Sequence, residues 1–376
     1  MDVLALFGAR VFDGALVRER AAVLVAGDTV IDVIGDDAIP SDARKRDLSG
    51  GVLVPGFIDL QVNGGGGVML NDGPSAARMA SIAQAHRHFG TTGLLPTLIT
   101  DTASVTESAI AAAAEAAGTV PGVLGLHLEG PHLAPRRRGA HLAELMRPMT
   151  DQDAELLIAA RDRVKTLLVT VAVEQVSTKL IRRLSDAGIV VSLGHTDAGY
   201  DEARAAFDAG ARSATHLFNA MSQLGNRDPG VVGAVLTAPG VSAGVIADGH
   251  HVHPETLRIA HSAKRGPGRL YLVTDAMACV GTQGDSFPLN GRTVFRQDGR
   301  LILDDGTLAG ADVDMASCVR YAANTLGLGL EEALRMASLY PAQLIGDESR
   351  GRIGRGAKAE FVHVDDDCRV LEVMCF

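Results

Sequence analysis

Short apolar runs that end in polar or small residues recur along most of the chain. In residues 123–132, VLGLHLEGPH, leucines alternate with polar or small residues, which is typical of a β-strand. A Gly-Pro pair ends this strand, and the alternation places the side chains of His127 and Glu129 on one face. Burying a carboxylate is costly unless a cation meets it. Glu129 is therefore either a surface residue at a strand end or part of a charged site.

Similar runs alternate with stretches that have helical periodicity. The runs predict strands at 53–62, 93–99, 123–132, 165–173, 189–193, 214–220, 241–247 and 270–274. Helices are predicted at 74–90, 102–117, 151–163, 177–187, 199–209, 254–264, 312–326 and 330–339. Roughly eight strands separated by helices favour a parallel (β/α)8 barrel, because buried parallel strands are nearly continuous apolar runs.

The two ends of the chain follow another pattern. Residues 1–52 and 346–376 predict short strands with little helical periodicity. Residues 286–309 contain Asn-Gly and Asp-Gly pairs, which predict an inserted β-hairpin region. We therefore expect a TIM-like barrel over residues 53–345, beside one small β domain built from both chain ends.

Composition narrows the classes of partner. The chain has 376 residues, 47% of them hydrophobic, so it can bury a large core. A net charge of −10 without a long basic run argues against nucleic acid or an anionic membrane as the main partner. The four cysteines have no CxxC spacing. No apolar run approaches the ~18 residues of a membrane span, and the first residues do not resemble a signal segment. We expect a cytoplasmic protein.

Several predicted barrel strands end in residues that can bind metal or transfer protons. Active sites of such barrels lie at the carboxyl ends of the strands. Glu129, His195 and His216 would supply three N or O ligands there, as in catalytic zinc sites that keep one position for water. A divalent cation lowers the pKa of bound water towards ~7. Asp275, at the end of the last strand, could take and return a proton.

Eight motifs occur in one order along nearly the whole chain. They are PGFIDLQVNG (55–64), GLHLEGPHL (125–133), GAH (139–141), SLGHTDA (192–198), ATHLFNAM (214–221), RDPG (227–230), IADGHHVH (246–253) and LVTDA (272–276). In these motifs the chain resembles the N-acetylglucosamine-6-phosphate deacetylase family of the amidohydrolase superfamily. The resemblance implies a barrel of the metal-dependent hydrolase type with a small β-sandwich domain, and a homodimer. It also implies hydrolysis of N-acetylglucosamine 6-phosphate to glucosamine 6-phosphate and acetate, with metal-bound water as the nucleophile.

The resemblance assigns roles to individual residues. It makes Glu129, His195 and His216 the metal ligands and Asp275 the general base and acid. His141 is expected at the substrate acetamide, and Ala140 is a further expected substrate contact. Asn219 and Ala220 are expected near the sugar phosphate, and Arg227 and His251 at the phosphate and sugar, one of which could come from a neighbouring subunit.

The first strand departs from the wider superfamily. Many members have His-x-His there for a second metal, whereas this chain has Gln61-Val62-Asn63, and no Lys ends the run 165–174. Amide side chains are poor zinc ligands beside imidazole. We therefore expect one divalent ion per subunit, Zn²⁺ first, with Fe²⁺, Co²⁺ and Mn²⁺ as alternatives. Gln61 would contact the metal-bound water or the substrate, or simply be a polar strand end.

Three other functions are weighed against this one. The same chemistry on N-acetylgalactosamine 6-phosphate would need no change in these motifs. A cyclic amidase, such as a dihydroorotase-like enzyme, is disfavoured by the absent His-x-His, and a non-catalytic barrel by the retained ligands and Asp275.

The loop after the Glu129 strand contains three consecutive arginines, Arg136 to Arg138. They are either a solvated charged surface or a source of attraction for an anionic substrate.

Overall fold

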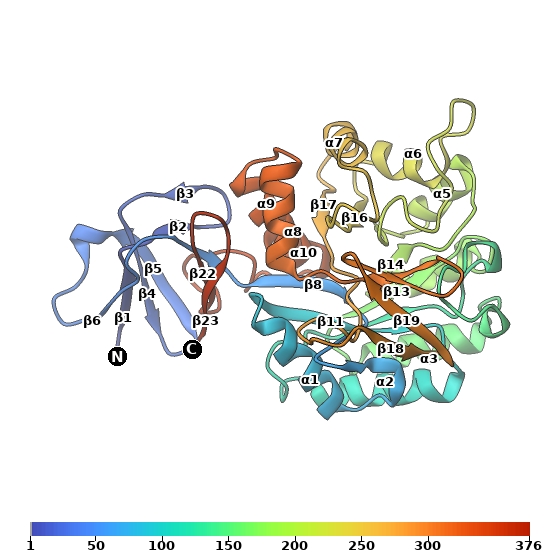
Figure 1. Cartoon of the computed structure of the whole chain (residues 1–376), viewed down its shortest axis with the longest axis horizontal. Helices are drawn as coiled ribbons and strands as arrows, with labels where there is room; N and C mark the ends of the chain where they lie inside the picture. The colour runs from blue at the N-terminus through green and yellow to red at the C-terminus, as the bar shows by residue number, and fades with distance from the viewer. Residues whose placement is uncertain (1) are drawn as a thin grey trace.

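Eight parallel strands form a barrel in the larger lobe of the computed structural model, which describes residues 2–376 (Figure 1). Neighbouring strands follow the order of the sequence. The ring closes where the Asp275 N–H donates to the Gln61 carbonyl oxygen at 3.0 Å. The predicted barrel fold is confirmed. Its strands are β8 (Phe57–Val62), β11 (Thr91–Ile99), β12 (Leu126–Glu129), β13 (Leu167–Val171), β14 (Val190–Leu193), β15 (Ser213–Ala214), β16 (Ser242–Val245) and β17 (Leu270–Leu272).

Helices cover the outside of the barrel (Figure 1). Several begin where the sequence places a capping side chain: Ser75, Thr102, Thr150 and Ser177 each accept a backbone N–H of the first turn. The helices are α1 (Ala76–Arg87), α2 (Ala103–Ala116), α3 (Asp151–Arg161), α4 (Thr178–Asp186), α5 (Tyr200–Asp208), α6 (Gly230–Thr237), α7 (Pro254–Ala263), α8 (Met315–Arg320), α9 (Leu330–Ala337) and α10 (Leu339–Ile345).

Helix α6 has no counterpart among the predicted helices. Its sequence, GVVGAVLT, is apolar around the whole circumference, and residues 230–236 are all buried. The helix packs beside α5 and α7, so neither a polar face nor a 3.6-residue period marks it. Hydrophobic periodicity therefore could not reveal it.

The single strand predicted at 53–62 is wrong, because the structure divides it into two. Strand β7 (Val52–Pro55) joins a sheet of the small domain, and β8 begins the barrel. Gly56 lies between them, so close to Thr92 that an added Cβ would lie 1.9 Å from the Thr92 Oγ1. Both halves are buried and apolar, so hydropathy does not mark this boundary.

Two packed sheets from both chain ends form the small β-sandwich domain, as predicted. One sheet has the order β5-β4-β1-β6 and the other β23-β22-β7-β2-β3. Leu6, Val23, Leu53 and Phe361 belong to the buried cluster that the sheets share. Met1, at the start of this predicted domain, lies outside the described residues. The remaining strands are β1 (Leu4–Phe7), β2 (Arg10–Phe12), β3 (Val17–Arg18), β4 (Ala21–Ala26), β5 (Thr29–Gly35), β6 (Arg44–Asp47), β22 (Glu360–Val364) and β23 (Val370–Cys375).

The predicted hairpin region is an antiparallel sheet beside the barrel. Asn290 and Gly291 form its first turn with φ values of 52° and 73°, as an Asn-Gly hairpin requires. The sheet is attached next to the last barrel strand, because the Ala311 N–H donates to the Asp275 carbonyl oxygen at 2.9 Å. Its strands are β18 (Ser286–Leu289), β19 (Arg292–Gln297), β20 (Arg300–Ile302) and β21 (Leu308–Ala311), and a smaller pair is β9 (Gly64–Gly65) with β10 (Val68–Met69).

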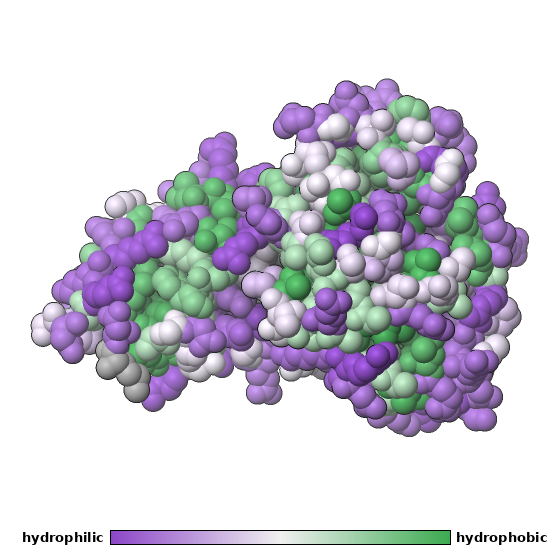
Figure 2. Space-filling model, turned by 90° about the horizontal axis from the view of Figure 1, so that it is seen from below, coloured by the Kyte–Doolittle hydropathy of each residue, from purple (hydrophilic) through white to green (hydrophobic). Residues whose placement is uncertain are grey.

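Hydrophilic residues dominate the outline of both lobes in Figure 2, and apolar residues gather on one side of the small domain. Among residues 2–376, no helix is both long enough and apolar enough to cross a membrane.

Candidate metal-dependent active site

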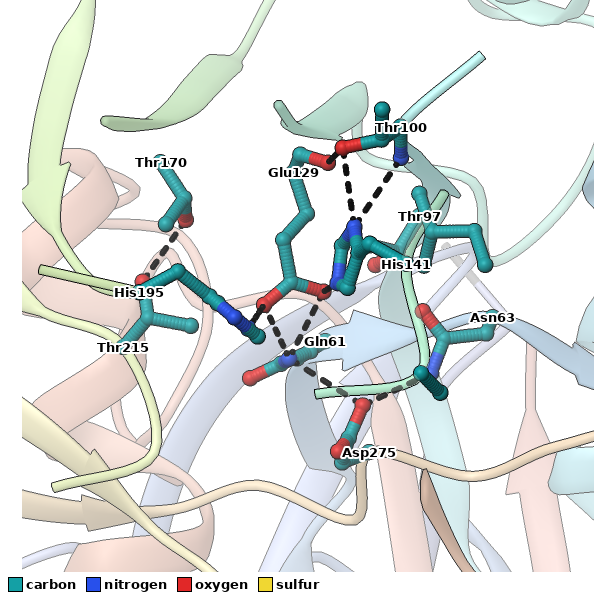
Figure 3. A network of polar contacts seen from close by, with 12 residues as sticks. Gln61, Asn63, Thr97, Thr100, Glu129, His141, Thr170, His195, Thr215 and Asp275 are labelled. Carbon is teal, nitrogen blue, oxygen red and sulfur yellow. Dashed lines mark hydrogen bonds and ion pairs between the residues drawn. The ribbon is translucent and has the colours of Figure 1, made fainter. Parts of the chain in front are cut away.

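Predicted site residues from five barrel strands meet at one end of the barrel (Figure 3). Gln61 lies on β8 and Glu129 ends β12, while His195, His216 and Asp275 follow β14, β15 and β17. All five are at most 9% exposed. Parallel strands present their carboxyl ends at the same rim, so positions far apart in sequence become neighbours.

The three proposed metal ligands point their donor atoms at one another. The Glu129 Oε1 lies 3.1 Å from the His216 Nε2 and 3.2 Å from the His195 Nε2. The two Nε2 atoms are 3.2 Å apart. Burial alone would raise the pKa of Glu129, but its contacts with both imidazoles hold that pKa well below its usual value. The pKa of His216 is raised, because Glu129 outweighs the effect of burial.

The tautomer of the neutral His195 ring tests whether a metal fits this site. Its Nδ1 lies 2.7 Å from the carbonyl oxygen of Arg137, which can only accept a hydrogen bond. Nδ1 therefore carries the proton in the neutral ring, and Nε2 directs a lone pair at Glu129 and His216. Such converging lone pairs need a proton or a cation between them. Two imidazole nitrogens and a carboxylate oxygen are a donor set that suits a divalent cation.

Asp275 lies beside the ligands and is held by two amides. The Asn63 Nδ2 donates to the Asp275 Oδ1 at 2.7 Å, and the Gln61 Nε2 donates to the same oxygen at 3.1 Å. Figure 3 shows that the Gln61 amide also faces Glu129, with both carboxylate oxygens at 3.3 Å. Burial, followed by the charge of Glu129, raises the pKa of Asp275.

Three of these residues have a backbone conformation that L-residues rarely adopt. The φ angles of His195, His216 and Asp275 are 48°, 28° and 53°. Residues that follow short strands must turn sharply to aim their side chains across the rim. Such strained conformations cluster at functional sites, where the surrounding structure holds them.

His141 reaches the site from the loop after β12. Its Nδ1 accepts the backbone N–H of Thr100 at 3.3 Å and lies 2.9 Å from the Thr100 Oγ1. Burial, followed by the charge of His195, lowers the pKa of His141 to about 3, so the ring is neutral with its proton on Nε2. Glu129, His141 and His195 also offer ligand atoms within 4.8 Å of one another. Because the His141 Nδ1 accepts the Thr100 N–H, the proton of the neutral ring lies on Nε2, which can donate a hydrogen bond.

A cavity of about 380 Å³ opens above the ligands. Most of the expected substrate contacts line it, namely Ala140, His141, Asn219, Ala220 and His251. The His251 Nδ1 lies 2.6 Å from the Asp248 Oδ2, a contact that fixes the orientation of the ring. Arg227 is not brought to this cavity, because it lies on an exposed loop.

Several other residues line the cavity without a site role expected from the sequence. Asn63 is one of them, although its place beside Gln61 in the same strand-end motif is a signal for such a role. Arg137 is another, and in the sequence it is part of a run of three arginines. No pattern in the sequence indicated that Leu289, Thr307, Leu308 and Gly310 of the inserted sheet would line the cavity.

Known proteins share both the sequence and the fold. The Amidohydrolase family model matches residues 52–375. The chain belongs to the amidohydrolase family.

Two relatives show which group of amidohydrolases this chain resembles. The chain is 42% identical to the N-acetylgalactosamine-6-phosphate deacetylase of Shewanella sp. (strain ANA-3), over 97% of this chain and 93% of the relative. It is 36% identical to the N-acetylglucosamine-6-phosphate deacetylase of Haemophilus influenzae, over 93% and 92%. The solved structure of N-acetylglucosamine-6-phosphate deacetylase from Pasteurella multocida has a TM-score of 0.95 and 36% identity, covering 99% of this chain and 98% of its own.

These findings confirm the family resemblance drawn from the motifs. An amidohydrolase barrel with a buried cluster of Glu and His side chains indicates a divalent metal site at the rim. The roles of individual residues stay predictions.

Proposed function

We propose that this amidohydrolase removes the N-acetyl group of N-acetylglucosamine 6-phosphate, giving glucosamine 6-phosphate and acetate. One divalent ion, Zn²⁺ first, would be held by Glu129, His195 and His216. The observation that carries the proposal is the convergence of these three ligands beside Asp275, in a cavity that can hold a sugar phosphate. The named deacetylase relatives support the choice of substrate.

When bound, the cation would polarise the acetamide carbonyl and lower the pKa of a coordinated water. The Asp275 carboxylate would accept a proton from the attacking water and return it to the leaving amine nitrogen. Asn63 and Gln61 orient that carboxylate through the hydrogen bonds to Oδ1. The His141 Nε2–H would donate to the acetamide oxygen as negative charge develops on it.

The rest of the cavity would hold the part of the substrate that does not react. Asn219, Ala220 and His251 would face the sugar and its phosphate, and binding energy from these contacts would position the acetamide. Arg227 would add a bidentate phosphate contact. Its exposed loop lies outside the cavity of its own chain, which supports a homodimer in which Arg227 completes the partner's site.

A galacto-configured substrate is the second candidate. The Shewanella relative, named for N-acetylgalactosamine 6-phosphate, shares 42% identity over nearly the whole chain. The two sugars differ only at C4, away from the acetamide, so the same chemistry serves both. We also propose a reducing compartment such as the cytoplasm, because Cys279, Cys318, Cys368 and Cys375 are all unpaired.

Acetate release tests the proposal directly. The purified chain would be given N-acetylglucosamine 6-phosphate, its galacto epimer and unphosphorylated N-acetylglucosamine, each with and without added Zn²⁺. We expect the highest kcat/KM for the gluco phosphate and a much lower value without phosphate. A preference for the galacto epimer would favour the second candidate, and absence of acetate from every substrate would overturn the proposal.

A further inference from the structure

The loop after β12 carries three consecutive arginines, and only one of them is firmly anchored. The Arg137 Nε and Nη2 donate to the Asp197 Oδ1 at 2.8 and 2.5 Å, and about a third of each side chain is exposed. Arg136 is 87% exposed and lies 3.9 Å from Asp197. The Arg138 side chain is exposed and has no ion pair within residues 2–376. The run is therefore not a uniform solvated surface.

The same arginine contacts a predicted metal ligand through its backbone. The His195 Nδ1–H donates to the Arg137 carbonyl oxygen at 2.7 Å. The loop contacts the ligand a second time, because the Ala134 N–H donates to the His195 carbonyl oxygen at 2.9 Å. Since Asp197 is two residues after His195, Arg137 holds both ends of one tripeptide: its carbonyl holds the imidazole, and its guanidinium holds the carboxylate.

Asp197 is itself fixed from the other side. Glu174, which follows β13, accepts the Asp197 backbone N–H and the Thr196 hydroxyl, both at 2.5 Å. The anchor of Arg137 is therefore tied to two barrel strands. This support matters because His195 has a φ of 48°, a conformation that the neighbouring structure must maintain.

We propose that Arg137 is a positioning residue for the metal ligand His195, and that its ion pair with Asp197 holds the carbonyl oxygen that orients the imidazole. The inference rests on the metal site proposed above. A hydrogen bond from Nδ1–H to a carbonyl sets both the tautomer and the ring direction of a ligating histidine. Arg137 also lines the cavity, so its loss could instead weaken attraction of an anionic substrate.

The rate of metal release, measured without substrate, separates a positioning role of Arg137 from a role in attracting the substrate. Full-length Arg137→Ala, Asp197→Asn and Arg137→Lys variants would be loaded with Zn²⁺, and release to excess chelator followed without substrate. We expect Arg137→Ala and Asp197→Asn to release the metal about tenfold faster than the original chain, within the range known for partners of metal ligands. Arg137→Lys should restore much of the retention, because an ammonium can still pair with Asp197. Arg138→Ala, the neighbouring control, should release metal at the original rate.

Two further measurements identify the cause. The Co²⁺-loaded Arg137→Ala variant should show an altered visible absorption spectrum, which a change in substrate attraction would not produce. Combining Arg137→Ala with Asp197→Asn should add little to either change alone, since both break one contact. If Arg137→Ala does not fold, Asp197→Asn and Arg137→Lys decide the question.

Unchanged release and spectra in Arg137→Ala and Asp197→Asn, with only a raised KM, would overturn the inference. Metal release from Arg138→Ala that is as fast as from Arg137→Ala would also overturn it. A His195→Ala variant tests the metal site separately. If His195→Ala retains Zn²⁺ like the original chain, the assignment of His195 as a ligand fails. If His195→Ala loses the metal while Arg137→Ala and Asp197→Asn keep it, only the positioning role of Arg137 fails.

Discussion

The proposed metal ligands and the proposed phosphate contacts come from different parts of the fold. In the proposed metal site, Glu129 ends β12, while His195 and His216 follow β14 and β15, and all three are almost completely buried. By contrast, His251 lies on a loop that lines the cavity, and Arg227 lies on an exposed loop outside it. The carboxyl ends of the barrel strands bring the first set together, whereas the second depends on loop conformation and, in our proposal, on a second subunit.

The largest expected effect is at the proposed metal site. Replacing Glu129 with Ala removes the only anionic member of the proposed ligand set and leaves two imidazoles to hold the ion. We expect metal content, measured by elemental analysis after desalting, to fall from one ion per chain to nearly none, with loss of acetate release. Glu107→Ala, on the exposed face of α2, is the control. Full metal content in Glu129→Ala would remove Glu129 from the ligand set.

The next effect separates proton transfer from metal binding. Asp275→Asn keeps the size of the side chain but removes the proposed base. We expect kcat to fall by about 10²–10⁴-fold, the usual contribution of general acid–base catalysis, while metal content is unchanged. Asp186→Asn, at the exposed end of α4, should behave like the original chain. A near-normal kcat in Asp275→Asn would assign proton transfer to another group.

A smaller effect tests the proposed phosphate contact of Arg227. Arg227→Ala should raise KM for the phosphorylated sugar by about 10–100-fold, as expected for loss of a charged hydrogen bond. The unphosphorylated sugar should be affected little, and Arg163→Ala is an exposed control. If the partner supplies Arg227, mixing Arg227→Ala chains with Asp275→Asn chains should regenerate sites that have both residues. Equal KM changes for both sugars would argue against a phosphate contact.

The smallest effect concerns the orientation of Asp275. Its hydrogen bond from Asn63 favours the ionised carboxylate, so Asn63→Ala should raise the pKa of Asp275. A base must be deprotonated to act, so the acidic limb of the kcat profile should move to higher pH. As the pH falls, Asn63→Ala would lose activity at a higher pH than the original chain. At pH values above the acidic limb, the two proteins would differ less. An acidic limb that stays in place would show that Asn63 does not tune this carboxylate.

Hydrophobic patterning was sufficient for most of the barrel. Buried parallel strands are apolar on both faces, so β11 and β13 stand out as runs, and polar residues at strand ends then mark the rim. Hydrophobic patterning fails where an element is buried on every side, because no polar residues then mark its period or its boundary. Helix α6 is apolar on every side, and β7 and β8 form one apolar run although they belong to different sheets.

His127 shows what sequence alone leaves open. It shares the face of Glu129, and that position is compatible both with a support for the proposed ligand and with a polar residue of the barrel interior. The structure places its Nε2 2.7 Å from the Thr170 Oγ1 and its Nδ1 3.1 Å from the Leu60 carbonyl oxygen. These contacts satisfy the ring inside the barrel, on the same strand as Glu129.

By itself, the sequence determined the barrel, the chain ends that form the second domain, and the motifs that identify the family. These depend on local periodicity and on residue types at strand ends, which are read along the chain. Only the tertiary structure decided that the Arg137 carbonyl meets His195, that Asn63 and Gln61 share Asp275, and that the inserted sheet lines the cavity. Such contacts join residues 58 to 214 positions apart, and no local pattern encodes their distance or direction.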